Sequence, residues 1–289
     1  MRISYWPDRV ALNGNIPYNA LLESLGKDYK LEKESLDSDA AVIWSVLWHG
    51  RMLKNKSVWD HYTKQNKPVI VIEVGGIKRG TTWKVGLNGI NRDAYFGPGG
   101  MDGLRSSNLG LELKPWRKDG EYILICGQHD KSLQWHNMPS MSSWFLQTYD
   151  TIRKHTDRPI IFRPHPRCRL EHIERGLKYV YRQEPKKIND TYDDFDMDFD
   201  NVFCTINWSS NPGIHSVING VPAFVGPSSL AYDVAGHNLE HIEYRQTPDR
   251  TQWVNDYAWT EYTVEEIARG LPLNRLRQTL ETNIINTMI

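Results

Sequence analysis

Short apolar runs alternate with helical patterns along most of this chain, and this alternation limits the possible folds more than any other feature. In the first third, apolar runs at Arg2–Trp6, Ala40–Leu47 and Pro68–Val74 are separated by helical patterns at Pro17–Leu25 and Ser57–Gln65. Strand, helix and strand in succession are typical of a parallel sheet with right-handed crossovers. The sequence therefore predicts the α/β class.

The same alternation restarts in the second half. Ser140 is placed to cap a helix, and Thr263 with Glu266 forms a capping box. The predicted strands are Glu121–Cys126, Pro159–Arg163, Asn201–Ile206 and Val221–Val225, and the predicted helices are Ser140–His155, Leu170–Lys178, Asn211–Ile218, Thr263–Gly270 and Leu273–Asn283.

Residues 75–120 interrupt the pattern, and we interpret them as a long loop with a linker near Leu113–Gly120. A chain of 289 residues is also long enough for two domains. We expect domains at 1–115 and 121–289, with the last helices free to pack back on the first. Two doubly wound domains would face a cleft, and ligands would bind beyond the carboxyl ends of the strands.

Composition excludes several classes of protein. Lysine plus arginine equals aspartate plus glutamate at 35 each, so no net charge attracts nucleic acid. No apolar run is long enough to span a membrane or to form a signal peptide, so we expect a cytoplasmic protein. Three cysteines scattered along the chain predict reduced thiols. The aspartates between Asp190 and Asp200 lack the glycine turn and distal glutamate of a calcium loop, and we interpret them as a solvated connector before the Asn201 strand.

Polar clusters follow the predicted strands of the second half. Glycine lets the backbone turn tightly beside a ligand, and two prolines stiffen the turn that carries two arginines and a histidine. Guanidinium and imidazole groups there suit a diphosphate. A capped turn and a rigid solvated loop are the structural alternatives. The candidates are Gly127, Gln128, Asp130 and Ser132 in the first cluster and Arg163, His165 and Arg167 in the second.

A third cluster joins a strand to a helix, and its candidates are Ser209, Ser210, Asn211 and His215. Hydroxyls and free N–H groups at a helix start form an anion site, although simple N-capping explains the same residues. In a fourth cluster, Gly220 ends that helix, and taken alone this cluster is structural.

As a set, these clusters resemble the donor-binding domain of GT-B glycosyltransferases, and most closely the capsule and Kdo-type polysaccharide transferases. The resemblance covers about residues 121–230 and rests on Gly127, Gln128, Asp130, Ser132, His165, Pro166, Arg167, Ser209, Ser210, Gly220 and Pro222. It implies a nucleotide-sugar co-substrate, UDP- or CMP-linked, with no other cofactor and no metal. The chain departs from the pattern in its small size and in carrying Asn211 and His215 where a glutamate is usual.

The small size is also similar to that of phage glycosyltransferases that modify hydroxymethylated pyrimidines in DNA. That likeness favours a DNA acceptor, in host cytoplasm, over a saccharide. The basic stretch from Gly75 to Arg92 would contact the acceptor through Lys78, Arg79, Lys84 and Arg92, as basic residues beside aromatics suit phosphates and stacked bases. An acidic saccharide or a solvated loop fits the stretch equally well.

An inverting transfer needs a general base. Glu73 is our first candidate because it ends a predicted strand before Gly75-Gly76, Asp8 is the second, and Asp93 and Asp102 are the third. An ion pair of Glu73 with Lys78 or Arg79 is the structural alternative. A nucleotide-sugar epimerase and a non-catalytic nucleic-acid-binding protein remain the competing functions; the sugar, the stereochemistry and the oligomeric state are left open.

Overall fold

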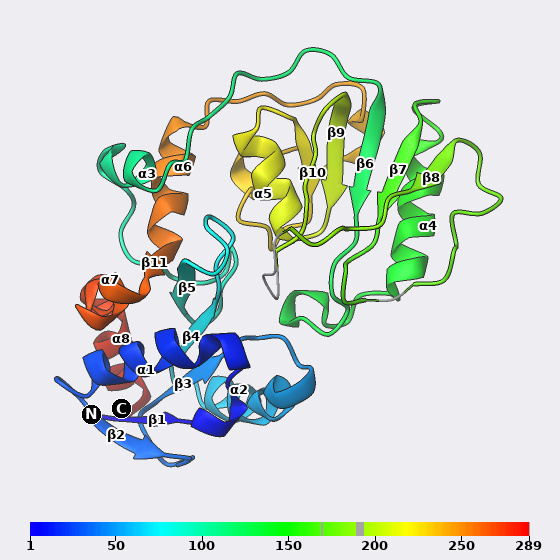
Figure 1. The fold of residues 1–289 in the computed structure, drawn as a ribbon. Coiled ribbons are helices and arrows are strands. Elements are labelled where there is room, and N and C mark those ends of the chain that lie inside the picture. Colours follow the sequence, from blue (N-terminus) through cyan, green and yellow to red (C-terminus); the bar gives the residue numbers. More distant parts are fainter. Residues whose placement is uncertain (169, 189–193, 289) are drawn as a thin grey trace. The chain divides into compact units, whose positions relative to one another are not determined.

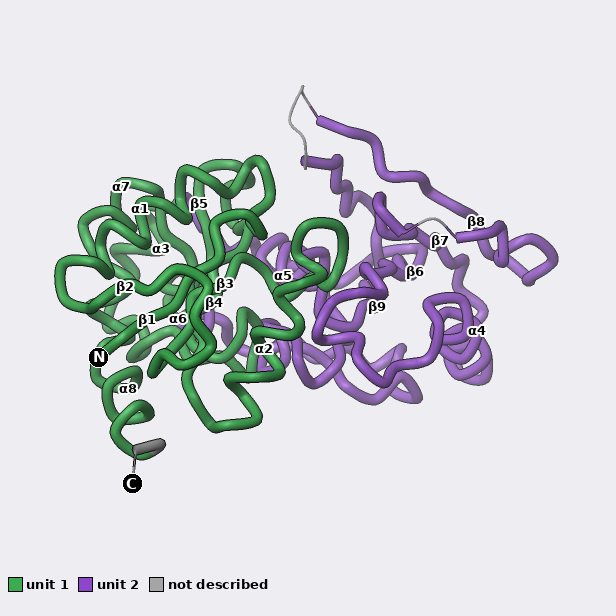
Figure 2. The backbone as a smooth tube through the Cα atoms, turned by 90° about the horizontal axis from the view of Figure 1, so that it is seen from below, with its two compact units in different colours: residues 1–109, 255–289 green, residues 110–254 purple. Residues whose placement is uncertain are grey.

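Two sheets, one of six strands and one of five, organise the computed structural model of this chain, which describes residues 1–168, 170–188 and 194–288. Unit 1 comprises Met1–Leu109 and Asn255–Ile289, and unit 2 comprises Gly110–Val254 (Figures 1 and 2). Relative to the expected domains at 1–115 and 121–289, the C-terminal helices join the first unit and the expected linker joins the second.

The unit 1 sheet has the strand order β11-β5-β4-β3-β1-β2. The four strands β2, β1, β3 and β4 run parallel, while β5 is antiparallel to β4 and β11 is antiparallel to β5. The bounds are β1 Arg2–Tyr5, β2 Lys30–Lys33, β3 Ala40–Trp44, β4 Val69–Val74, β5 Thr82–Leu87 and β11 Glu261–Thr263.

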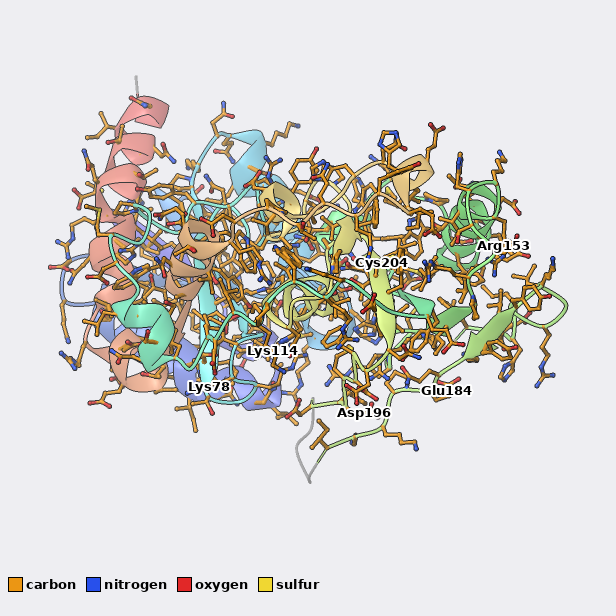
Figure 3. The ribbon with its side chains drawn as sticks, turned by 90° about the horizontal axis from the view of Figure 1, so that it is seen from above. Lys78, Lys114, Arg153, Glu184, Asp196 and Cys204 are labelled. Carbon is orange, nitrogen blue, oxygen red and sulfur yellow. The ribbon has the colours of Figure 1, made fainter. Side chains whose placement is uncertain are left out.

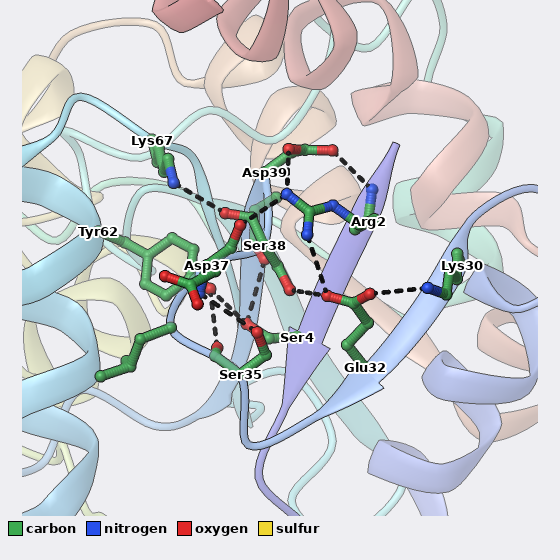
Figure 4. Close-up of polar contacts among 12 residues, drawn as sticks. Arg2, Ser4, Lys30, Glu32, Ser35, Asp37, Ser38, Asp39, Tyr62 and Lys67 are labelled. Atoms are coloured by element: carbon green, nitrogen blue, oxygen red, sulfur yellow. Dashed lines mark hydrogen bonds and ion pairs between the residues drawn. The ribbon is translucent and has the colours of Figure 1, made fainter.

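Helices cover this sheet, and one core joins α1, α7 and α8 to alternate residues of its strands. Ile3 points into that core, whereas its neighbour Ser4 shares a 2.7 Å hydrogen bond with Tyr62 of α2 (Figure 4). The sheet is therefore buried on both faces, as a parallel sheet requires. The helices are α1 Asn15–Leu25, α2 Asn55–Lys64, α3 Leu104–Asn108, α6 Thr251–Tyr257, α7 Val264–Ala268 and α8 Leu271–Met288.

The unit 2 sheet is parallel throughout, in the order β10-β9-β6-β7-β8. Residues of β6 alternate between two cores: Ile123 and Ile125 pack with α4, and Leu124 and Cys126 pack with Val221 and its neighbours. The bounds are β6 Tyr122–Cys126, β7 Ile160–Arg163, β8 Val180–Arg182, β9 Val202–Asn207, β10 Ala223–Val225, α4 Met141–Ile152 and α5 Asn211–Ile218.

Seven short 3-10 helices lie between these elements in the part of the chain that the structure describes. They are Pro7–Arg9, Leu12–Gly14, Gly50–Lys54, Leu133–Trp135, Tyr232–Val234, Leu239–His241 and Ala258–Thr260. No described helix has both the length and the apolar character needed to cross a membrane.

Several local predictions are confirmed. The Ser140 side chain accepts a hydrogen bond from the Ser143 backbone N–H at the start of α4, and Thr263 and Glu266 form both bonds of the capping box at α7. The α5 bounds are those predicted.

Two predictions are wrong. The stretch expected to be a long loop contains β5 and α3, because β5 completes the sheet as an antiparallel strand. The helix expected at Leu170–Lys178 is replaced by turns. There Gly176 has a left-handed φ of 91°, and buried Glu174 is held by His172 and Arg182.

The expected linker is bound to unit 2 rather than extended between domains. The Lys114 N–H donates to the Ile218 carbonyl at 3.0 Å, and the Arg117 N–H donates to the Gly220 carbonyl at 2.6 Å. Gly220 has a φ of 75°, and a Cβ at this position would lie 2.1 Å from the Pro115 carbonyl oxygen. Only glycine therefore fits this junction.

Candidate functional site

The order of the unit 2 strands reverses between β6 and β9. From β6 the chain adds β7 and β8 on one side, and then β9 and β10 on the other. In open parallel sheets, such a switch point leaves a crevice beyond the carboxyl ends of the two strands where ligands bind. Gly127 follows β6 there, and Ser209 follows β9.

Gln128 connects the two strand ends. Its Oε1 accepts hydrogen bonds from the Ser209 N–H and the Ser209 hydroxyl, each at 3.0 Å, and its Nε2 donates to Ser132 Oγ at 3.0 Å. Gln128 is only 5% exposed and Ser209 only 6%. The structure thus brings together three of the predicted donor-binding residues in one hydrogen-bonded network, in which Gln128 and Ser209 are buried and Ser132 is half-buried.

Two histidines lie at the neighbouring strand end. The rings of His129 and His165 meet edge to face, with centroids 5.4 Å apart. A Cβ at Gly127 would lie 3.2 Å from the His165 backbone nitrogen, so glycine permits this close approach. The His165 Nδ1 accepts from the Arg167 N–H at 3.1 Å, which orients the ring. Asp130 is half-buried beside His129, and Arg167 is exposed.

Arg163 is placed differently from the predicted diphosphate clamp. It ends β7 and is 5% exposed. Its guanidinium donates to Asp196 Oδ1 at 2.9 Å and to the Asp196 carbonyl (Asp196 is labelled in Figure 3). It also donates to Gln183 Oε1 at 3.2 Å. Burial alone would raise the pKa of Asp196, but the Lys186 backbone N–H and Arg163 outweigh this effect and lower it. The structure therefore pairs Arg163 with a carboxylate of its own unit, and it does not group Arg163 with His165 and Arg167.

The third cluster forms the start of α5. Ser210 is the N-cap residue but makes no side-chain cap bond; Pro212 lies in the first turn, which contains no acid. The buried Asn207 side chain instead donates to the Ser210 carbonyl at 2.8 Å. A Cβ at Gly213 would lie 2.3 Å from Asn207 Oδ1. Asn211 and His215 follow on α5 and are half-buried.

In unit 1, Glu73 lies near the carboxyl end of β4 and is partly exposed. Its Oε1 accepts from the Val74 N–H at 3.1 Å. Desolvation raises the pKa of Glu73, opposed by a hydrogen bond from Ser45 and by the charges of Arg79 and Lys84. A carboxyl group with a raised pKa, open to solvent on one side, is suited to proton transfer.

The other predicted carboxylates of unit 1 are on the surface: Asp8 in the first 3-10 helix, and Asp93 and Asp102 in the loop after β5. Of the predicted acceptor-binding residues, Lys78 and Arg92 are exposed, and Arg79 donates to the Gly75 carbonyl at 3.2 Å. Lys84 lies in β5 and is 4% exposed, which corrects its placement in a surface loop.

Within the described residues, no group of three or more histidine, cysteine, aspartate or glutamate side chains could hold a metal ion. Of the aspartate-rich stretch, Asp190 and Asp193 lie outside the described residues. Asp194 to Asp200 lie in irregular backbone before β9, with an isolated β-bridge between Phe195 and Lys187.

Sequence reasoning missed two residues that organise these sites, Asn207 and Glu261. For Asn207 a signal was available, since an asparagine at the end of a predicted strand stands two residues before the Ser209-Ser210 helix start. Glu261 gave no local signal, since its partners lie almost two hundred residues earlier in the chain.

The fold is similar to that of two solved structures. One is KpsC of Thermosulfurimonas dismutans, a β-Kdo 2,7-transferase, matched over 95% of this chain and 99% of that chain with 14% identity and a TM-score of 0.50. The other is the β-Kdo 2,4-transferase KpsC of the same organism, matched over 94% and 98% with 12% identity and a TM-score of 0.49. No protein-family model and no curated protein matches the sequence. The first likeness and the two parallel-rich sheets confirm the predicted fold class, a GT-B fold of two Rossmann-like domains.

Proposed function

We propose that this chain is a glycosyltransferase that moves a sugar from a nucleotide-sugar donor to a saccharide hydroxyl. The observation that carries the proposal is the junction of Gln128 and Ser209 at the switch point of a parallel sheet, beside the start of α5. The GT-B fold supports it, because the donor domain of this fold binds nucleotides beyond the carboxyl ends of its strands.

The donor would bind unit 2. The helix start at Ser210 and Asn211 would accept a phosphate, since backbone N–H groups and the helix dipole both favour an anion there. Arg167 and His165 are the proposed partners of the diphosphate or monophosphate, and Gln128 holds the loop in place. The nucleotide would be UDP or CMP, without a metal, and Kdo is among the sugars to test because the similar structures are described as Kdo transferases.

A saccharide is the proposed acceptor in place of hydroxymethylated DNA. The DNA interpretation depended on a basic surface formed by residues 75–92, yet Lys84 is buried in β5 and Arg79 contacts a backbone carbonyl. The exposed positive charge that remains in this stretch is smaller than the DNA interpretation requires. Epimerase chemistry is disfavoured because the first turn of α5 carries no acid.

Glu73 is the proposed general base for an inverting transfer. The acceptor oxygen would attack the anomeric carbon, its proton would move to the Glu73 carboxylate, and the bond from that carbon to the phosphate oxygen would break. The leaving phosphate would keep the bonding electrons and be stabilised by the donors of unit 2. Asp8, exposed in the first 3-10 helix, is the second candidate.

The test is a nucleotide-binding screen of the full chain by thermal shift and calorimetry with UDP, CMP and GDP. A ligand at 100 times its Kd adds about 2.7 kcal/mol of stability, which is measurable. We expect one pyrimidine nucleotide to bind and Ser209→Ala to weaken it, while Thr247→Ala, at an exposed position of unit 2, leaves binding unchanged. Binding of no nucleotide, or equal binding by Ser209→Ala, would contradict the assignment.

A further inference from the structure

A row of three charged residues crosses unit 1 from β4 to β11. Glu73 stands opposite Lys84 in the β4–β5 register, and Lys84 stands opposite Glu261 in the β5–β11 register. Residues directly opposite each other in antiparallel strands share a face, with Cβ atoms about 5 Å apart. Lys84 is 4% exposed and Glu261 is fully buried. The row therefore sets a buried ammonium between two carboxylates.

Glu261 is the fixed end of the row. Its Oε1 accepts from the Gly76 N–H at 2.6 Å and from the Tyr257 hydroxyl at 3.4 Å. Its Oε2 accepts from the Ile77 N–H at 2.9 Å and from the Thr82 hydroxyl at 2.7 Å. With four donors directed at it, this carboxylate holds the turn that follows β4 and has no capacity left for a substrate.

Glu73 is the open end of the row. It is the one member with partial exposure, and it accepts hydrogen bonds from the Val74 N–H and the Ser45 side chain. The two carboxylates thus differ in their surroundings, so one is suited to anchoring and the other to proton transfer. A pair of carboxyl groups with contrasting environments is a recurring arrangement in acid–base catalysis.

We propose that Lys84, which stands opposite both Glu261 and Glu73 in the sheet, is the positioning residue that holds the Glu73 carboxylate in its ionised form. This rests on the proposed function, in which Glu73 accepts the acceptor proton. Two charges a few ångströms apart interact strongly when water is excluded, so a buried ammonium favours the neighbouring anion.

The other groups facing Glu73 act in the directions that the proposal requires. Burial raises the pKa of Glu73, and the Ser45 hydrogen bond, the Val74 N–H, Arg79 and Lys84 oppose that rise. Burial lowers the pKa of Lys84, and Glu261 and Glu73 oppose that fall. Arg79 is half-buried near the turn, and it leaves part of the positive charge in place when Lys84 is replaced.

The test is a titration of the Glu73 carboxyl carbon by NMR in the full chain labelled at glutamate, with the signal assigned by its loss in Glu73→Gln. Lys84→Met keeps most of the length of the side chain and removes its charge. We expect the Glu73 midpoint to move to higher pH by about one unit in Lys84→Met and to stay close to wild type in Lys84→Arg. If Lys84→Met does not fold, Lys84→Gln is titrated in its place. An unchanged midpoint in the folded uncharged variant would overturn the proposal.

The activity readout separates this inference from the proposed function. Once a donor is found, the acid limb of the kcat/KM profile should move upward with the Glu73 midpoint, while nucleotide affinity stays unchanged. A purely structural Lys84 would instead lower transfer equally at every pH. If wild type transfers no sugar, the proposed function fails, yet the NMR titration still decides whether Lys84 controls Glu73.

Discussion

Ser209 directs both its N–H and its hydroxyl at the side-chain oxygen of Gln128, each at 3.0 Å, across the switch point of unit 2. Both residues are buried, so water cannot replace the glutamine. The bond pair fixes the β9–α5 loop to the end of β6. It therefore links the stability of unit 2 to the geometry of the proposed donor site.

Gln128→Ala should lower the free energy of unfolding by about 1–3 kcal/mol, because the buried Ser209 N–H loses its acceptor. Gln128→Glu is the matched control. Its carboxylate still accepts from Ser209, although it can no longer donate to Ser132 as the amide does. We expect Gln128→Glu to be closer to wild type in urea unfolding but weaker in nucleotide binding, because a negative charge is added near the phosphate. Equal stability of all three proteins would argue against a structural link.

Replacing Arg163 and replacing Arg167 should have different effects on the free energy of unfolding. Arg163→Met should cost about 1–3 kcal/mol, a range that allows for the partial exposure of Asp196. Arg167→Met should change stability by less than about 0.5 kcal/mol, because its side chain is exposed, and should weaken nucleotide binding. Urea unfolding and calorimetry measure both effects. A stable Arg163→Met variant that loses only nucleotide binding would support the predicted role of Arg163 in binding the diphosphate.

The Arg163 effect should depend on pH. The pKa of Asp196 is lowered in the folded protein, so its contribution is present above the unfolded pKa of about 3.9 and is lost as pH falls through the folded value. The stability difference between wild type and Arg163→Met should therefore shrink below about pH 4, measured by urea unfolding at several pH values. A difference that stays constant down to pH 2 would mean that packing, not charge, carries the effect.

Glu73 should show the opposite pH dependence. Its pKa is raised by burial, so the folded state binds the proton more tightly and stability falls as pH rises from about 4 through the folded pKa. Glu73→Gln should therefore be more stable than wild type at pH 8, and this gain should disappear near pH 4. Transfer, in contrast, should be lost. A Gln variant that is less stable at pH 8 would indicate a structural ion pair instead.

Gly75→Ala tests the anchor of the charged row. A Cβ at position 75 would lie 2.3 Å from both Glu261 Oε2 and the Thr82 carbonyl oxygen, so the turn must shift. We expect a loss of about 1–3 kcal/mol, as for overpacked cores. Gly103→Ala is the control in the same unit, since its nearest neighbour would be 3.7 Å away. Thermal unfolding of the two variants gives the comparison.

Much of unit 2 could be predicted from the sequence because its signals are local. A parallel strand buried on both faces is a continuous apolar run, as in Tyr122–Cys126 and Val202–Asn207. A proline in the first turn of α5 and a left-handed glycine after its last turn define the ends of this helix independently of what it packs against. The hydrogen bonds between Gln128 and Ser209 depend on the order of the strands in the sheet, which the sequence suggests but does not specify.

The sequence by itself determined the α/β class, the central strands and the strand-end clusters that supply the candidate donor site. Only the tertiary structure decided that β5 and β11 complete the first sheet, that Lys84 is buried between Glu73 and Glu261, and that Arg163 pairs with Asp196. The reason is physical. A buried charge or a polar edge strand is stable only with partners that come from distant parts of the chain, and no local pattern encodes which partners arrive.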